Sequence, residues 1–191
     1  MTLVEGFSIF GSLASAGAII VSVAVFWKQR INELKTIKNN KFNELEALKV
    51  IIYDEVRENY IWLVKTLRFC HCVWDKKIRH LTYNDVGHLP FIEYTNLNGL
   101  LEQMPFRKLS TRVMDNHLLD VSRIDDNLIK MLIQVRYCTH HYNEAIINGF
   151  NNFAKSNPNI LQLSSYIDGM KEFITNFENG SEEIMKYCRQ Q

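Results

Sequence analysis

The sequence predicts an all-α protein with one N-terminal transmembrane helix, a long helical stalk and an antiparallel cytosolic helical bundle. Three observations lead to this class. The chain of 191 residues contains only three prolines and eight glycines, so few positions would interrupt a helix. No charged side chain occurs from Phe7 to Trp27. From Leu45 onward, apolar residues recur with the period of the α-helix, about 3.6 residues per turn.

The first helix is predicted from the uncharged run FSIFGSLASAGAIIVSVAVFW, which covers 21 residues from Phe7 to Trp27. A helix needs roughly 20 apolar residues to cross the hydrocarbon core of a bilayer. A cleaved secretory signal would carry Lys or Arg before a shorter apolar run. Here Glu5 precedes the run and the basic residues follow it. We therefore expect a permanent anchor. A buried helix of a soluble core is the alternative, although such a core rarely needs an uncharged run of this length.

Basic residues after the run predict the orientation of the anchor. Only Glu33 opposes them, and they are Lys28, Arg30, Lys35, Lys38 and Lys41. Cytoplasmic flanks carry the excess of Lys and Arg, so the short N-terminus is expected outside and the rest of the chain in the cytoplasm. This places the protein in the cell inner membrane as a single-pass protein. The same basic residues are expected to contact anionic lipid head groups.

Small residues in the run share one helix face, with spacings of three and four, and predict self-association within the membrane. They are Gly11, Ala14, Ser15, Ala18 and Ser22. Small side chains allow two helix backbones to approach closely in lipid, where packing and weak hydrogen bonds hold them together. A homo-oligomer is therefore expected.

Three regions follow from these patterns: 1–27 as tail and anchor, 28–44 as a basic helical linker, and 45–191 as the cytosolic bundle. The apolar stripe from Leu45 to Leu81 predicts one helix that packs on later helices of the same chain. Coiled-coil pairing between copies is expected nearer the membrane, with a break in the helix near Lys38–Lys41 because Asn is a modest helix former.

The rest of the chain is expected to fold back on this helix. Thr82–Pro90 is the first turn cluster, and a short amphipathic segment, FIEYTNLNGLLEQM, follows it. Residues 109–153 and 160–177 show helical periodicity. Gly180 is expected to end the second of these helices, and Ser181 to begin a last short one as its N-cap.

The order of anchor, long charged helix and returning helices resembles a loose group of uncharacterised bacterial and archaeal single-pass membrane proteins. In that group a short segment rich in aromatic residues and leucine, here FIEYTNLNGLLEQMPFRKL, joins the stalk to the later helices. The resemblance implies a helical cytosolic domain and implies no activity.

One pattern points to an enzyme as the alternative. Arg136 and His141 have the Arg-x4-His spacing of HEPN-type ribonucleases, which the chain also resembles in its helical character. That resemblance implies that His141 would be the acid/base and that Arg136 would hold the RNA phosphate. Arg112 and His117 show the same spacing. The alternative interpretation of His141 is a polar position on the flank of a helix.

The cysteines and histidines allow a zinc site to be considered. Cys138 with His141, and His71 with Asp75, have spacings that one helix face can present to a metal. Cys70 and Cys72 point in different directions on a helix, and Cys in an apolar stripe is commonly a small hydrophobe. No metal or other cofactor is therefore predicted. The basic group Lys76–His80 is interpreted as a solvated helix end. The net charge of +1 does not favour nucleic acid as a partner.

The sequence thus predicts a membrane-anchored, self-associating protein that presents a cytosolic bundle to an unidentified cytosolic protein. Its expected partners are membrane lipids, further copies of itself and that protein. It would be a scaffold, or the membrane-acting effector of a bacterial stress or anti-phage defence system. An anchored ribonuclease using Arg136 and His141 is the alternative.

Overall fold

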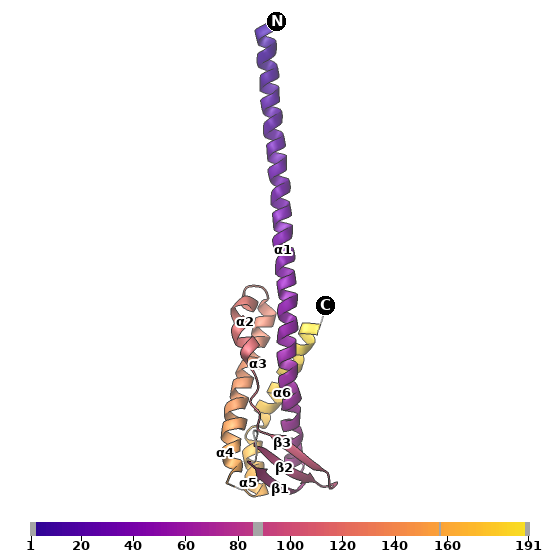
Figure 1. Ribbon diagram of the computed structural model, residues 1–191, viewed down its shortest axis with the longest axis vertical. Coiled ribbons are helices and arrows are strands. Elements are labelled where there is room, and N and C mark those ends of the chain that lie inside the picture. Colours follow the sequence, from indigo (N-terminus) through magenta and orange to yellow (C-terminus); the bar gives the residue numbers. More distant parts are fainter. Residues whose placement is uncertain (1–2, 86–89, 157, 190–191) are drawn as a thin grey trace. The chain divides into compact units, whose positions relative to one another are not determined.

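A computed structural model describes the backbone of residues 3–85, 90–156 and 158–189, and the side chains from Gly17 onward within these ranges. The protein is mostly helical, with one small sheet (Figure 1). The elements follow the order α1 (Leu3–Trp74), β1 (Ile78–Asn84), β2 (Phe91–Asn96), β3 (Leu101–Pro105), α2 (Arg112–Ser122), α3 (Asp126–Tyr142), η1 (Asn143–Phe150, a π-helix), α4 (Asn151–Ala154), α5 (Ile160–Asp168) and α6 (Lys171–Arg189).

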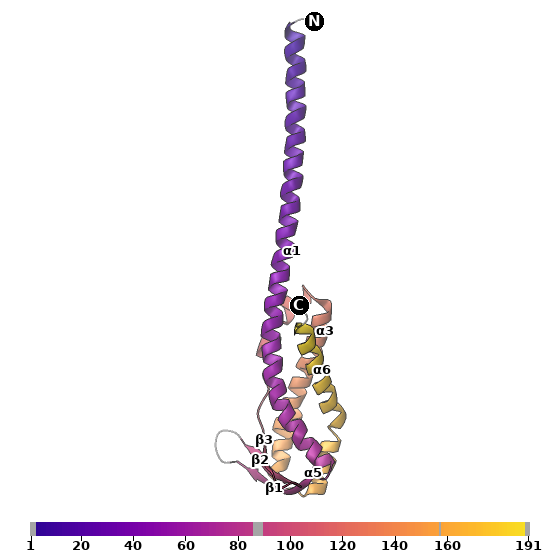
Figure 2. The ribbon, with the colours of Figure 1, turned by 90° about the vertical axis from the view of Figure 1, so that its right-hand side faces the viewer.

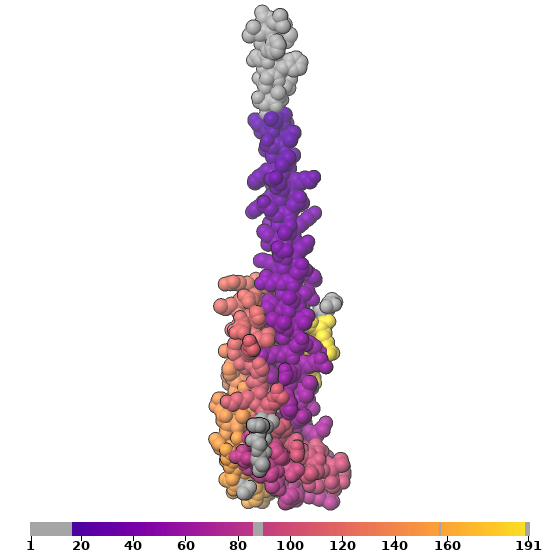
Figure 3. All heavy atoms as spheres, in the orientation of Figure 1, coloured from indigo at the N-terminus to yellow at the C-terminus, as the bar shows by residue number. Residues whose placement is uncertain are grey.

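The chain divides into two compact units, residues 1–44 and residues 45–191. In the first unit, helix α1 continues through Lys38–Lys41, so the break expected there is absent. Its described side chains project from the helix on all sides (Figure 3). No helix within the part of the chain that the structure describes is long and apolar enough to cross a membrane. Residues 7–16, almost half of the predicted membrane run, lie outside the described side chains.

The second unit has an apolar core built mainly by α1, α3 and α6. Along α1 the buried side chains include Ile52, Val56, Leu63 and Phe69, which continue the stripe seen in the sequence. Helices α3 and α6 cover them with Leu128, Leu132, Val135, Ile174, Phe177 and Ile184. The sheet lies at the end of this unit where α1 finishes (Figures 1 and 2). The helical prediction for residues 45–74 is confirmed.

The strands show where the all-α prediction is wrong. β1, β2 and β3 form an antiparallel sheet in that order, with Leu81 opposite Tyr94 and Tyr94 opposite Glu102. Residues 78–81 had been expected to continue the helix, and residues 91–104 to form a short amphipathic segment of an all-α protein. On β2, Ile92 and Tyr94 are buried while their neighbours along the strand are only partly covered, which is the two-residue period of a strand.

Helix α1 ends in a motif that normally uses glycine. Lys76 has a positive φ of 54°, the N–H of Lys77 donates to the carbonyl of Cys72 and the N–H of Lys76 donates to that of Val73. This pair of hydrogen bonds is the Schellman arrangement. Because lysine replaces glycine at the left-handed position, the sequence carries no visible stop signal before Ile78.

The last helix also differs from the expectation. Helix α6 runs unbroken from Lys171 to Arg189, so Gly180 does not end a helix and Ser181 does not begin one. Gly180 instead lies against α3, where a Cβ atom would sit 3.6 Å from Val135 Cγ2, and Ser181 is buried. The glycine therefore serves close helix packing. The break between helices comes earlier, after Asp168, and α5 starts with a capping box formed by Asn159 and Gln162.

Candidate functional surfaces

The first surface is the apolar part of α1 in residues 17–44. Large apolar side chains there are exposed on every side of the helix: Ile19, Ile20, Val21, Val23, Val25, Phe26, Trp27, Ile31, Leu34, Ile37 and Phe42. Ile20 is 69% exposed and Trp27 is 62% exposed. Apolar area of this extent on a soluble monomer marks a surface that contacts a membrane or another protein.

All five predicted packing residues lie on α1, and the side chains of two of them are described. Ala18 and Ser22 lie one turn apart and are exposed, and a Cβ atom at the neighbouring Gly17 would have no atom within 4 Å. Gly11, Ala14 and Ser15 lie outside the described side chains. The described part of the small-residue face is therefore open.

The predicted basic residues follow directly. Lys28, Arg30, Lys35, Lys38 and Lys41 are all exposed. Arg30 pairs with Glu33 at 3.4 Å. Within the described residues, the four lysines have no acidic partner within 4.0 Å, so their charges are available to an external anion.

Arg136 and His141 have separate partners. Arg136 Nε donates to Asp115 Oδ1 on α2, and His140 Nε2 lies 4.0 Å from the same oxygen. The Thr111 hydroxyl also donates to Asp115, and this hydrogen bond together with Arg136 lowers the pKa of the carboxyl. His141 packs edge-on against Phe173 of α6, with ring centroids 4.4 Å apart. The two residues of the alternative ribonuclease site are thus each engaged elsewhere, Arg136 in an ion pair and His141 in an aromatic contact.

The residues considered for zinc are not arranged as a metal site. Cys70 and Cys138 are buried in the apolar core, and burial raises the pKa of the Cys70 thiol to about 12. A thiol held in its neutral form is a poor metal ligand. Among the residues whose side chains are described, no group of three or more His, Cys, Asp or Glu could hold a metal ion.

A polar strap that the sequence did not predict connects the sheet to α2. The strap consists of residues 106–111, and the backbone groups of its Leu109 and Ser110 find their hydrogen-bond partners in side chains. Asn59 of α1 accepts from the Ser110 N–H at 2.9 Å and donates to the Ser110 carbonyl at 2.7 Å. Asn143 of η1 accepts from the Leu109 N–H at 2.8 Å and donates to the Leu109 carbonyl at 3.0 Å. These amides replace the neighbouring strand that an extended segment would otherwise need.

Glu55 of α1 completes this connection. Its buried carboxylate accepts from the Ser110 hydroxyl at 2.6 Å, the Val113 N–H at 2.9 Å and the Met114 N–H at 3.0 Å. The two N–H groups belong to the first turn of α2, where a helix lacks internal acceptors. Glu55, a residue of α1, thus caps the N-terminus of α2. Its position beside the apolar stripe was visible in the sequence, but its partners were not.

A separate surface is the turn between β2 and β3. Leu97, Leu100 and Leu101 are 46%, 61% and 64% exposed. The turn is nevertheless well fixed, because the Asn96 side chain accepts from the N–H groups of Asn98 and Leu100, and Gly99 supplies a positive φ of 78°. Three exposed leucines on a fixed turn make it a candidate interaction surface.

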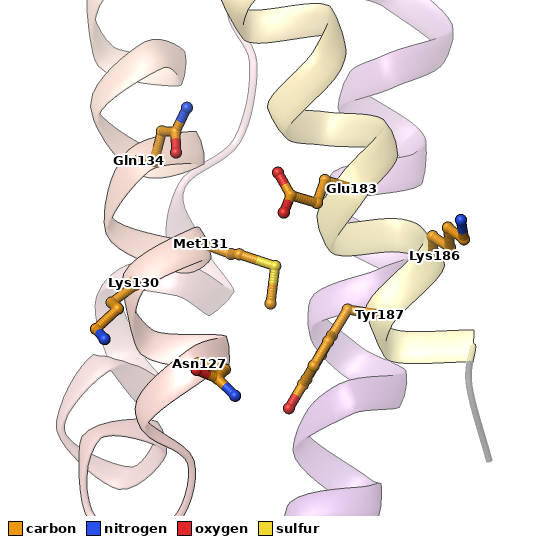
Figure 4. A pocket seen from close by; sticks show the side chains of 7 residues that line it. All are labelled: Asn127, Lys130, Met131, Gln134, Glu183, Lys186 and Tyr187. Atoms are coloured by element: carbon orange, nitrogen blue, oxygen red, sulfur yellow. The ribbon is translucent and has the colours of Figure 1, made fainter.

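Two of the grooves beside α6 differ in their lining. The groove between α3 and α6 has a volume of about 520 Å³. In Figure 4, Met131 and Tyr187 face one another across it, while Lys130 and Lys186 point away from its centre. The groove on the other side, between α1 and α6, has a volume of about 670 Å³ and a different character, with Arg57, Lys186 and Arg189 among its lining residues.

Comparison with known protein families, with characterised proteins and with solved structures finds no match for this chain. Its function is therefore argued from its own residues.

Proposed function

We propose that the protein is a membrane-anchored, self-associating helical protein of the inner membrane that presents its bundle to a protein partner in the cytoplasm. The observation that carries this proposal is the uncharged run Phe7–Trp27, followed by basic residues. The exposed apolar side chains of residues 19–27 support it, because their contact with water is costly and lipid tails would remove it. Lys28 and the later basic residues would meet the lipid head groups.

Self-association is proposed to use the small-residue face. Ala18 and Ser22 would let a second helix approach closely within the bilayer. Gly11, Ala14 and Ser15 belong to the same predicted helix face and would do so as well. Beyond the anchor, Ile31 and Leu34 continue an apolar stripe that a neighbouring copy could cover as a coiled coil.

The partner-binding surface is proposed to be the β2–β3 turn. Leu97, Leu100 and Leu101 are exposed, and the sheet whose turn carries them lies at the end of the bundle unit where α1 finishes. A protein anchored through residues that precede this unit in the chain would offer these leucines to partners in solution. This arrangement suits a scaffold or an effector of a bacterial defence system that is triggered by such a partner.

Membrane anchoring is tested with the full chain expressed in bacteria and extracted with alkaline carbonate. The wild type is expected to stay in the membrane pellet. The double substitution Ile20→Arg with Val23→Arg should release it, because arginine within a span is costly, up to roughly 2.5–3.5 kcal/mol at its centre. Val50→Arg on the bundle part of α1, where Val50 is also exposed, is the matched control and should stay in the pellet. A wild-type protein that carbonate releases would contradict the proposal.

Self-association is tested by crosslinking in membranes. Ala18→Leu and Gly11→Leu should each reduce crosslinked oligomers, because a large side chain separates the backbones. Ala24→Leu makes the same change about 120° away from Ala18 around the helix and should not. Undiminished crosslinking in both variants would show that this face is not the contact.

A further inference from the structure

The groove between α1 and α6 combines a defined geometry with an excess of positive charge. Four residues of α1 line one wall and four of α6 line the other: Tyr53, Arg57, Tyr60 and Ile61 opposite Glu182, Met185, Lys186 and Arg189. The groove of about 670 Å³ falls within the range of small-molecule sites, roughly 300–1,000 Å³. All eight residues belong to the bundle unit.

Two side-chain ties hold the walls together. At one end the Tyr60 hydroxyl donates to Glu182 Oε1 at 2.6 Å. At the other end Arg189 donates to the Tyr53 hydroxyl, and its guanidinium lies over the Tyr53 ring, 4.8 Å from the centroid. Seven residues separate the ties on each helix, so about 10 Å of helix lies between them. The ties fix the width of the groove.

Arg57 and Lys186 lie between these ties, one on each wall. Neither has an acidic partner within 4.0 Å among the side chains that the structure describes. Glu182 is the acid of the groove, and it is engaged by Tyr60. The hydrogen bond to Glu182 raises the pKa of Tyr60 to about 12, so the hydroxyl keeps its proton well above neutral pH.

The groove therefore has an excess of positive charge that Glu182 does not neutralise. Three cations, Arg57, Lys186 and Arg189, stand against one acid that already accepts a hydrogen bond. Arg57 and Lys186 can approach one anion from opposite walls, and guanidinium and ammonium groups both bind phosphate well. Ile61 and Met185 provide apolar surface beside them for an organic group.

We propose that this groove binds a small organic phosphate. The phosphate lies between Arg57 and Lys186, with Arg189 beside it, and the organic part covers Ile61 and Met185. The anchored bundle would then carry a small-molecule site that is separate from the leucines of the β2–β3 turn. Occupation of the site would join α1 to α6 by a third tie, between the two that the protein makes itself.

The test uses the full chain in a nonionic detergent and a buffer free of phosphate and sulfate. ADP, inorganic pyrophosphate and adenosine are titrated separately by isothermal titration calorimetry. We expect saturable binding of ADP and pyrophosphate and none of adenosine, which lacks the anionic group. Arg57→Gln and Lys186→Gln should each weaken binding about tenfold, the effect of losing one charge-assisted hydrogen bond.

Matched variants separate the site from general surface charge. Arg68→Gln removes an exposed arginine of α1 outside the groove, and Lys130→Gln removes a lysine on the opposite side of α6; both should leave the affinity unchanged. Glu182→Gln should bind pyrophosphate more tightly, because it removes the one acid. The proposal fails if no saturable binding occurs at millimolar concentration, or if the control variants weaken binding as much as the groove variants. All of these side chains are polar groups at the surface, so circular dichroism spectra should match the wild type.

Discussion

Helix α1 contains two stretches with similar sequence patterns and opposite surroundings. Between Leu45 and Trp74, one face of the helix is buried by α3, α6 and the strap, and Ile52 and Leu63 are 0% exposed. Between Gly17 and Glu44 the helix has apolar side chains of the same kinds, yet Ile31 is 49% exposed and Leu34 is 53% exposed. Apolar spacing thus specifies the helix in both stretches, while burial depends on which other segments are available.

The difference has a physical consequence for the first unit. Most of the stability of a protein helix comes from packing its apolar face, not from the intrinsic preference of its residues. Residues 45–74 obtain this packing from their own chain. Residues 17–44 have no covering segment among the described residues, so their apolar side chains lack this packing there. In the function proposed above, lipid covers the uncharged part and a second copy covers Ile31 and Leu34.

The largest effect is expected from equal truncations in the two stretches. Ile52→Ala should lower the free energy of unfolding of the bundle by about 2–5 kcal/mol, because it removes buried methyl groups and leaves a cavity. Ile31→Ala should change it by no more than about 0.5 kcal/mol when the protein is too dilute for copies to associate, because Ile31 is then exposed. Urea denaturation of the full chain in nonionic detergent, followed by circular dichroism, measures both. A cost at Ile31 that approaches that at Ile52 and grows with protein concentration would show that Ile31 is buried against another copy.

A smaller effect is expected from the polar connection between α1 and α2. Glu55→Gln keeps one acceptor oxygen but places an NH₂ group among three donors, from Ser110, Val113 and Met114. The free energy of unfolding should fall by about 1–3 kcal/mol. Glu58→Gln, three residues further along the same helix, removes only an exposed pair with Arg107 and should cost less than about 1 kcal/mol. Equal costs at the two positions would show that the buried cap does not stabilise α2.

The sequence predicted the segments in which one period extends over several turns. The stripe through Leu48, Ile52, Val56 and Leu63 defines the packed part of α1, and the seam through Leu163, Ile167, Ile174 and Phe177 defines α5 and the first part of α6. Amphipathic periodicity depends only on local spacing, which explains why it could be recognised without the fold. Positions where the chain must turn depend on weaker signals.

Features that depend on contacts between distant segments were missed. Lys76 ends α1 without the usual glycine, which left Ile78 and Leu81 to be assigned to a helix. Gly180 was interpreted as a helix end because its packing against Val135 of α3 cannot be seen in one segment. The partners of Glu55, Asn59 and Asn143 lie 34 or more residues away along the chain.

The same limit applies to the candidate sites. The spacing of Arg136 and His141 was visible, but the ion pair of Arg136 with Asp115 and the packing of His141 on Phe173 depend on the positions of α2 and α6. The groove between α1 and α6 could not be foreseen either. Arg57 and Lys186 belong to opposite ends of the bundle sequence, and only antiparallel packing of the two helices brings them to one groove.

The smallest effect is expected from the ion pair between α2 and α3, and it depends on pH. The Thr111 hydrogen bond and Arg136 lower the pKa of Asp115 in the folded protein, so the folded state favours the charged carboxylate. Its contribution is complete above the unfolded-state pKa of about 4 and is lost as pH falls through the lower folded-state value.

Asp115→Asn should therefore lower the free energy of unfolding at pH 7 by no more than about 1 kcal/mol, since the pair is partly exposed and screened by solvent. The difference from the wild type should shrink when urea denaturation is repeated below about pH 4. Asp168→Asn, at an exposed position without an ion pair among the described side chains, is the control and should show no such pH dependence. A difference for Asp115→Asn that stays constant down to pH 2 would show that packing of the side chain, and not its charge, contributes the stability.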